Sequence, residues 1–402
     1  MGDKLVVENL IKVFGDDPAR AVEMLDQGRT KDDILRETGM TVGVSGVDFT
    51  VAEGETFVVM GLSGSGKSTL VRMINRLIEP SSGSITIDGA SVTGASDAEL
   101  RRLRLEKIAM VFQHFALFPH RSVRANVEFG LKVQGVAPAE RSERALRMLE
   151  QVGLDAWADQ SPAQLSGGMQ QRVGLARGLA VDPEVLLMDE PFSALDPLIR
   201  ADMQNELMHL QKQLHKTIIF ITHDLNEALT LGDRIAIMEN GRFVQVGTAA
   251  EIVSHPANDY VAAFTQDIDR GRVFTARDVM QPAEALELAD TTPQAALERM
   301  EALGRDALYV RDGARIAGVV RYRDLSAAAR TNGADLARHL VAGYPAVAQD
   351  THLYQMYEAA SGGLPVAVKD CDGALAGVAE PDMIFAQLAA RTEAQRNTER
   401  GA

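Results

Sequence analysis

The stretch Phe57-Val58-Val59-Met60-Gly61-Leu62-Ser63-Gly64-Ser65-Gly66-Lys67-Ser68-Thr69 decides how the first half of the chain folds. Residues 61–69 match the pattern G-x-x-x-x-G-K-[ST], between an apolar strand-like run and a helical run. Glycines let successive backbone N–H groups turn towards a phosphate, and a helix N-terminus adds a favourable field. Lys67 would supply positive charge, and the Ser68 hydroxyl would ligate Mg²⁺. We therefore predict that residues 61–69 bind nucleotide phosphates, because a ligand-free glycine-rich turn does not explain this strand–loop–helix context.

Downstream of this loop, short apolar runs alternate with helical patterns as far as Phe264. Apolar runs of four residues without alternation are typical of strands that are buried on both faces of a parallel sheet. This order predicts an α/β fold. The expected strands are Val185–Met188, Ile218–Ile221 and Arg234–Met238, and the expected helices are Thr69–Ile78, Pro197–Leu214 and Leu225–Leu231.

The N-terminal residues predict strands interrupted by a helical insertion at 17–40. The expected strands are Lys4–Val7, Ile11–Phe14, Val42–Val51 and Thr56–Met60. Within the insertion, Thr30 followed by Asp33 has the spacing of a capping box, and Gly39 stands where a helix would end. Between Gln113 and Leu165 the pattern is mostly helical, which indicates a subdomain inserted into the α/β order.

Composition places the chain among ordinary globular proteins and argues against several classes. It has 402 residues, 46% hydrophobic and 24% charged, with a formal charge of -15 and one cysteine, Cys371. We expect two to three domains, no nucleic-acid partner, and a reducing compartment without an internal disulfide. The N-terminus lacks the order of a signal peptide, and no apolar run is long enough to span a membrane. We therefore expect a cytoplasmic chain whose membrane role comes through a partner.

A second apolar strand ends in two carboxylates, Asp189 and Glu190. A solvated pair would be the default explanation, but downstream of a phosphate loop this pattern is more specific. Asp189 is placed to hold the Mg²⁺ shell, and Glu190 to orient or deprotonate the attacking water, because phosphoryl transfer depends mainly on positioning and charge neutralisation.

The segment Leu165-Ser166-Gly167-Gly168-Met169-Gln170 offers a hydroxyl and backbone donors at a second helix N-terminus. It resembles the signature sequence of ATP-binding-cassette (ABC) ATPases. Other elements of that family follow in the family's order: Gln113 is similar to the Q-loop glutamine, Asp196 to the D-loop aspartate and His223 to the switch histidine. The resemblance implies an N-terminal antiparallel β part, a mixed or largely parallel sheet, and a helical subdomain at about 114–164.

The same resemblance implies a head-to-tail homodimer with two ATP molecules at its interface. Each ATP would lie between the phosphate loop of one chain and residues 165–170 of the other. Glu190 is then the catalytic base, His223 contacts the γ-phosphate, and Ser68, Gln113 and Asp189 hold Mg²⁺. Phe14 is the candidate for stacking on adenine, with core packing as the equal alternative.

Within the family, the insertion, Phe115–His120, Ser193–Arg200 and Asn258–Tyr260 resemble the ATPase subunit of glycine betaine/proline-type importers. This implies attachment to the cytoplasmic side of the cell membrane through permease subunits. An extracytoplasmic solute-binding protein would deliver the solute to that permease. Residues 112–118 would dock the permease, or form a local core cluster. Choline, carnitine or an amino acid stays open as the solute. An ABC ATPase acting on DNA or ribosomes and a purely regulatory module are less favoured, since the chain lacks a long coiled coil and keeps its hydrolytic residues.

The C-terminal part contains an internal repeat with a period of about 60 residues. It resembles a tandem pair of cystathionine-β-synthase (CBS) domains at 273–330 and 334–390, after a linker at 266–272 and before a polar tail at 391–402. CBS pairs that bind nucleotides usually carry a hydroxyl before an Asp, but this chain has Arg321–Asp324 and Ala379–Asp382 there. We expect a module that senses ionic strength, with Arg311, Arg315, Arg321 and Arg323 either contacting anionic lipid or forming a solvated face.

Overall fold

The computed structural model describes residues 2–113, 115–266, 268–313, 315–329 and 335–389. It divides into two compact units, Met1–Thr265 and Gln266–Ala402, and each is described by itself. The expected tail at 391–402 lies outside the described residues.

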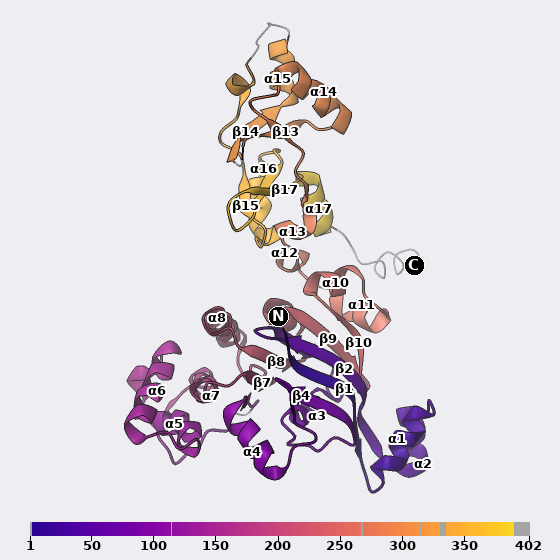
Figure 1. Ribbon diagram of the computed structural model, residues 1–402, viewed down its shortest axis with the longest axis vertical. Helices are drawn as coiled ribbons and strands as arrows, with labels where there is room; N and C mark the ends of the chain where they lie inside the picture. The colour runs from indigo at the N-terminus through magenta and orange to yellow at the C-terminus, as the bar shows by residue number, and fades with distance from the viewer. Residues whose placement is uncertain (1, 114, 267, 314, 330–334, 390–402) are drawn as a thin grey trace. The chain divides into compact units, whose positions relative to one another are not determined.

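The first unit begins with a four-stranded antiparallel sheet in the order β2-β1-β4-β5 (Figure 1). Its strands are β1 (Asp3–Phe14), β2 (Thr41–Ala52), β4 (Ser82–Ile87) and β5 (Ala90–Ser91). The insertion between β1 and β2 forms α1 (Pro18–Asp26) and α2 (Lys31–Thr38). The capping box of Thr30 with Asp33 is confirmed, and Gly39 ends α2 in the left-handed conformation with φ of 72°.

The second sheet of this unit has six strands in the order β10-β9-β3-β8-β7-β6. The five strands from β9 to β6 are parallel, and only β10 at the edge is antiparallel. Every residue of β3, β7 and β8 is buried, which confirms the α/β fold with strands covered on both faces. The strands are β3 (Thr56–Met60), β6 (Ile108–Val111), β7 (Val185–Asp189), β8 (Thr217–Thr222), β9 (Arg234–Glu239) and β10 (Arg242–Gly247).

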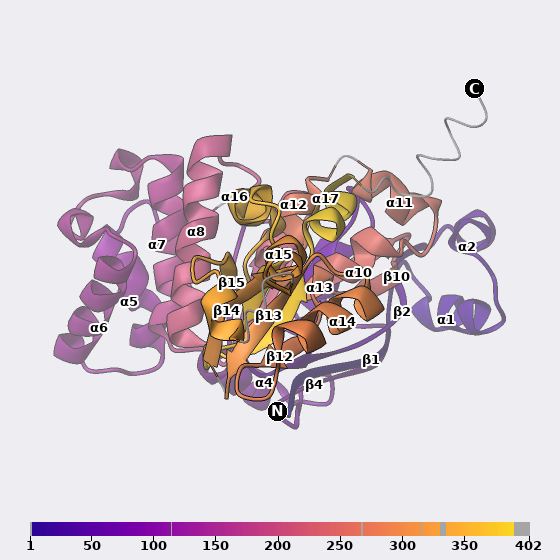
Figure 2. The same ribbon diagram turned by 90° about the horizontal axis from the view of Figure 1, so that it is seen from above.

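Helices α5, α6, α7 and α8 gather on one side of the first unit, as both ribbon views show (Figures 1 and 2). The helical character expected for residues 113–165 is confirmed. The helices of this unit after α2 are α3 (Lys67–Ile74), α4 (Asp97–Glu106), α5 (Val123–Val133), α6 (Pro138–Gln151), η1 (Asp155–Trp157), η2 (Pro162–Gln164), α7 (Gly167–Ala180), α8 (Pro197–Leu214), α9 (Leu225–Leu231), α10 (Ala249–Ser254) and α11 (Asp259–Thr265).

In the first unit, α3 and β1 differ from the expected elements by more than one residue. The helix expected at Thr69–Ile78 begins at Lys67 and ends at Ile74, because Arg76 takes φ of 55° and Ile78 N–H donates back to the Arg72 carbonyl. Leu77, which the expected helix included, lies beyond the end of α3 and is 53% exposed. The strands expected at 4–7 and 11–14 form one strand, β1, whose register shifts around Leu10 next to Asn9 at φ of 42°.

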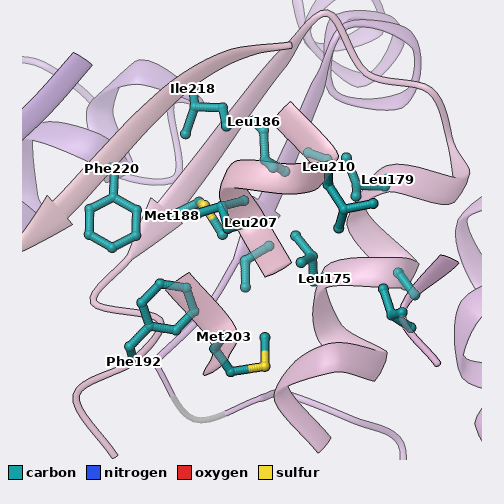
Figure 3. Packing of buried hydrophobic residues seen from close by; sticks show 14 of the residues in the cluster. Leu175, Leu179, Leu186, Met188, Phe192, Met203, Leu207, Leu210, Ile218 and Phe220 are labelled. Atoms are coloured by element: carbon teal, nitrogen blue, oxygen red, sulfur yellow. The ribbon is translucent and has the colours of Figure 1, made fainter. Parts of the chain in front are cut away.

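The hydrophobic core beneath the second sheet supports the loop that follows β7. Met188 and Phe192, on either side of Asp189 and Glu190, are fully buried and pack among side chains of α7, α8 and β8 (Figure 3). The rings of Phe192 and Phe220 lie 5.6 Å apart. Close packing on both sides of the two carboxylates fixes the backbone that carries them.

The second unit repeats one arrangement twice. In each half a helix precedes a strand pair, and a third strand joins it in parallel: β12, β13 and β14 in one half, β15, β16 and β17 in the other. The elements are α12 (Arg270–Val273), α13 (Ala276–Val279), β11 (Gln281–Pro282), β12 (Ala285–Glu287), α14 (Pro293–Leu303), β13 (Ala307–Asp312), β14 (Arg315–Arg321), α15 (Tyr322–Ala329), η3 (Leu336–His339), β15 (Ala346–Ala348), η4 (Leu353–Met356), α16 (Tyr357–Ser361), β16 (Val366–Lys369), β17 (Leu375–Ala379) and α17 (Pro381–Ala389).

The two halves of this unit share a core around Tyr309. Its hydroxyl donates to the Pro365 carbonyl at 2.7 Å, and burial raises the pKa of this phenol. Part of the segment expected as a linker is helical, since α12 begins at Arg270, which donates through Nε to the Gln387 carbonyl at 3.1 Å.

Candidate functional site

The phosphate-loop residues 61–66 connect β3 to α3, as the motif predicts. Gly61 and Gly66 have φ of 155° and 108°, where a side chain is strained. A Cβ at Gly61 would lie 2.2 Å from the Met238 carbonyl oxygen, and one at Gly66 would lie 2.4 Å from the Gly43 carbonyl oxygen. Around Gly64 the space is open. The loop is therefore packed closely at both ends and free in the middle, where Leu62, Ser63 and Gly64 are exposed.

Lys67 lies buried under this loop. Its Nζ donates to the carbonyls of Gly61 at 2.8 Å and Leu62 at 3.0 Å, and lies 3.9 Å from Glu190 Oε1. Burial lowers the pKa of the Lys67 ammonium, while the carboxylates of Glu190 and Asp189 act in the opposite direction. The positive charge is thus held at the point where the loop, α3 and the end of β7 meet.

Asp189 is held by α3 through both of its oxygens. Oδ1 accepts from the Ser68 hydroxyl at 2.9 Å, and Oδ2 accepts from Arg72 Nε at 3.2 Å and Nη2 at 3.0 Å. The described residues contain no cluster of three or more His, Cys, Asp or Glu side chains suited to a metal ion. One hydroxyl beside one carboxylate nevertheless fits Mg²⁺, which binds proteins through one or two carboxylates and completes its shell with phosphate oxygens and water.

Glu190 and His223 meet at the carboxyl ends of two neighbouring parallel strands, β7 and β8. His223 Nδ1 lies 2.8 Å from Glu190 Oε2. Glu190 has φ of 47°, an uncommon conformation for a residue with a side chain. Its N–H donates to the Ile221 carbonyl at 3.1 Å, which holds that turn in place. The side chain of His223 is 54% exposed, so this carboxylate–imidazole pair faces solvent.

Gln113 reaches the same group through Ser193, which the motif analysis did not single out as a site residue. Gln113 Nε2 donates to Ser193 Oγ at 3.0 Å, and that hydroxyl donates to the Glu190 carbonyl at 3.0 Å. No hydrogen bond between Gln113 and Ser68 or Asp189 occurs in the described part of the chain. Gln113 therefore contacts the turn of Glu190, and its expected place in the Mg²⁺ shell stays a prediction.

The signature segment 165–170 stands apart from these groups. Within the ranges that the structure describes, none of its residues forms a hydrogen bond or ion pair with the phosphate loop, Asp189, Glu190 or His223. Ser166 caps α7 by accepting from the Met169 N–H at 3.3 Å, and Gln170 Nε2 donates to the Leu165 carbonyl at 3.2 Å. Ser166 and Gly167 are exposed, whereas Leu165 is buried.

Asp196 supports the signature segment from behind. Its Oδ1 caps α8 by accepting from the Ile199 N–H at 3.1 Å. A Cβ at Gly168 would lie 2.3 Å from Ile199 Cγ2, so α8 packs directly against the first turn of α7. Asp196 thus fixes the start of α8, against which the buried Gly168 packs.

Phe14 lies beside the start of α3. A Cβ at Gly43 would lie 2.8 Å from the Phe14 ring and 3.6 Å from Thr69 Cγ2. The ring is 43% exposed, and Lys12 Nζ lies 5.1 Å from its centroid. Core packing therefore does not account for the whole of this ring, which leaves an aromatic face near the phosphate loop.

The segment after Gln113 has an unusual backbone. Phe115 and Ala116 both have positive φ, of 45° and 49°, and their carbonyls accept from the Arg177 guanidinium at 3.0 and 2.6 Å. Burial lowers the pKa of Arg177. His114 lies outside the described residues.

In the second unit, a cavity of about 670 Å³ is lined by residues of both halves. The two segments that lack the hydroxyl typical of nucleotide-binding CBS pairs, 321–324 and 379–382, contribute Arg321, Arg323 and Asp382 to the cavity wall. Arg311 pairs with Glu287 at 2.9 Å and Arg323 with Asp324 at 3.4 Å.

No helix among the described residues combines the length and apolar character needed to cross a membrane.

Comparisons with known proteins agree with this geometry. The sequence model of the ABC transporter family matches residues 44–193. The chain is 49% identical over 392 residues to the glycine betaine transport ATP-binding protein OpuAA of Bacillus subtilis, covering 97% of this chain and 93% of that protein. It is 48% identical over 387 residues to the glycine betaine/carnitine transport ATP-binding protein GbuA of Listeria monocytogenes, covering 96% and 97%.

The fold of the first unit has a counterpart among solved structures. The post-hydrolysis dimer of the ATP-binding cassette MJ0796, bound to ADP and Pi, is 32% identical with a TM-score of 0.52. The match covers 61% of this chain and 98% of that one.

Proposed function

Because this chain belongs to the ABC transporter ATP-binding protein family, and is therefore an ATP-hydrolysing subunit, we propose that it drives uptake of glycine betaine- and proline betaine-type solutes through a membrane permease. The observation that carries this proposal is the 49% identity to a glycine betaine transport ATP-binding protein over 97% of the chain. The aligned region of 392 residues includes the second unit as well as the ATPase unit, so the similarity extends beyond the motifs that every ABC ATPase needs.

The chemistry of the site supports ATP hydrolysis with defined roles. Lys67 and the backbone of residues 61–66 bind the phosphates, with Ser63, Ser65 and Thr69 lining the same loop. Glu190 positions and deprotonates the attacking water, and His223, 2.8 Å away, holds that carboxylate and contacts the γ-phosphate. Ser68 and Asp189 would hold Mg²⁺, with Gln113 nearby. When bound, Mg²⁺ would neutralise charge on the β- and γ-phosphates.

The separation of the signature segment supports a composite site made by two chains. Ser166 and Gly167 are exposed at the start of α7, a helix of 14 residues whose N-terminus attracts anions. Leu165–Gln170 of one chain would close over ATP held by the phosphate loop of a second copy. In this head-to-tail homodimer each ATP contacts both chains, and Phe14 stacks on the adenine.

The partner in the membrane would be a pair of permease subunits, to which an extracytoplasmic solute-binding protein delivers the solute. The stretch 112–118, which includes Phe115 and Ala116 with their positive φ, would dock the permease, because it connects β6 and Gln113 to the helical subdomain. Arg177, which anchors this segment, belongs to α7, the helix that begins at the signature. The chain would then lie on the cytoplasmic side of the membrane.

The second unit would act as a tandem CBS module that adjusts activity to ionic strength. Its doubled helix–strand arrangement supports this assignment. Of the four arginines expected as a lipid-binding patch, Arg311 and Arg323 already pair with carboxylates, which leaves Arg315 and Arg321 to contact anionic lipid. Screening by salt of such partly exposed charges would alter contacts with a membrane surface.

The experiment measures ATP hydrolysis by the complete transporter in lipid vesicles, titrated with glycine betaine, carnitine, choline and proline at low and high internal salt. We expect stimulation by glycine betaine that rises with salt, and loses its salt dependence when the chain is truncated after residue 270. The same complex carrying Glu190→Gln is the background control. A response to carnitine or choline alone would overturn the betaine assignment, and betaine stimulation independent of salt would overturn the regulatory role of the second unit.

A further inference from the structure

We propose that Arg72 is a positioning residue for magnesium: it orients the Asp189 carboxylate so that one oxygen is presented to the metal. The inference rests on the proposed role of Asp189 and Ser68 and adds to it a residue outside the motif. Arg72 lies on α3 one turn after Ser68, at the i+4 spacing that places two side chains on the same helix face. Both side chains reach the same carboxylate.

The two oxygens of the Asp189 carboxylate have different hydrogen-bond partners. Two donors of the Arg72 guanidinium, Nε and Nη2, donate to Oδ2 at 3.2 and 3.0 Å. Oδ1 is left with the Ser68 hydroxyl at 2.9 Å. Arg72 therefore occupies the oxygen that faces away from Ser68, and Oδ1 stays beside the hydroxyl that would be the second metal ligand.

Burial makes this orientation matter. The Asp189 side chain is 3% exposed, so water cannot substitute for a lost partner, whereas Arg72 is 46% exposed. Solvent screens the charge of the guanidinium, which limits its repulsion of a metal ion, while its hydrogen bonds still fix the carboxylate plane. Partners that orient a metal-ligating carboxylate are worth about 10- to 100-fold in metal affinity. Lysine can replace Arg72 only in part, because its ammonium lacks the fixed planar pair of donors.

The test measures how strongly metal binding and ATP binding support each other in the full chain. In the Glu190→Gln background, where hydrolysis is blocked, the dissociation constant of ATP is measured in excess EDTA and in Mg²⁺. We define the metal effect as the dissociation constant in EDTA divided by the dissociation constant in Mg²⁺. We expect Arg72→Met to lower this ratio about tenfold or more while the EDTA value stays unchanged. Arg72→Lys should fall between Arg72→Met and the parent.

The control is Arg102→Met, which removes an exposed arginine that pairs with Glu106 at 2.9 Å on α4. It should leave the metal effect unchanged. If the parent shows no metal effect, the proposed magnesium site fails. If the parent shows one and both Arg72 variants keep it, or strengthen it, the positioning role is wrong. Loss of ATP affinity in EDTA, in Arg72→Lys as well as Arg72→Met, would indicate a structural role instead and also overturn the inference.

Discussion

The phosphate loop and the signature segment are two glycine-containing loops that each open a helix, yet their surroundings differ. Around the first, Ser68 donates to Asp189, and Glu190 lies 3.9 Å from Lys67 Nζ and 2.8 Å from His223 Nδ1. Around the second, Ser166 accepts from the Met169 N–H of its own helix turn, and Ser166 and Gly167 are exposed. This difference supports the proposed composite site, in which the first loop gathers the reacting groups within one chain and the second would complete the site of another copy.

The largest effect should come from the carboxylate beside the phosphate loop. Glu190→Gln removes the base and is expected to lower the rate of ATP hydrolysis by about 10²- to 10⁴-fold, with ATP binding retained. Phosphate release and equilibrium binding of ATP measure the two properties separately. A variant with full hydrolytic activity would remove Glu190 from its role.

Ser166→Ala should lower hydrolysis by about 10²- to 10³-fold, because a donor aimed at transition-state charge is lost. ATP binding to the dilute chain should not change. The variant also loses the cap of α7, which costs about 1 kcal/mol of stability. Ser122→Ala is the matched control, since Ser122 caps α5 by accepting from the Ala125 N–H at 3.2 Å. Equal losses of activity in the two variants would assign Ser166 a capping role only.

The two signature glycines should separate packing within the chain from contact with a partner. Gly168→Ala meets Ile199 at 2.3 Å and should lower the free energy of unfolding by about 1–3 kcal/mol. For Gly167→Ala the new Cβ would lie 3.8 Å from the side chains of Leu195 and Phe115, so stability should hold. Hydrolysis should nevertheless fall, by up to about 100-fold, if ATP on a second chain approaches there. Thermal unfolding and phosphate release test this, and wild-type activity in Gly167→Ala would contradict a close partner.

The smallest effect is expected at Phe14. Phe14→Ala should weaken ATP binding about tenfold, the value of one aromatic–base stack, while Phe14→Tyr should retain it. The ring is 43% exposed, so unfolding should change little. Unchanged ATP affinity in Phe14→Ala, measured by titration calorimetry, would assign the ring to packing alone.

The phosphate loop and the carboxylates Asp189 and Glu190 followed from local patterns, because each depends on neighbouring residues. His223 followed only from the family resemblance, since the structure alone shows that β7 and β8 are neighbours that end at the same edge. Ser193 was missed as a site residue because its hydrogen bonds depend on a turn that no spacing rule specifies. Arg72 was missed although its i+4 spacing from Ser68 was visible, because only the tertiary structure shows which carboxylate it meets. The end of α3 was predicted too late because the left-handed turn at Arg76 carries no glycine signal.

The central claim, a site completed by a second chain, is tested most directly by mixing two defective proteins. Lys67→Ala removes the phosphate-binding charge of one part of the site, and Ser166→Asp replaces the signature hydroxyl with a negative charge. Each protein alone should therefore be inactive. A mixed dimer contains one composite site with both parts intact. We predict that an equal mixture recovers about a quarter of the wild-type rate of ATP hydrolysis, because half of the dimers are mixed and each has one intact site. A mixture no more active than its components would contradict the account.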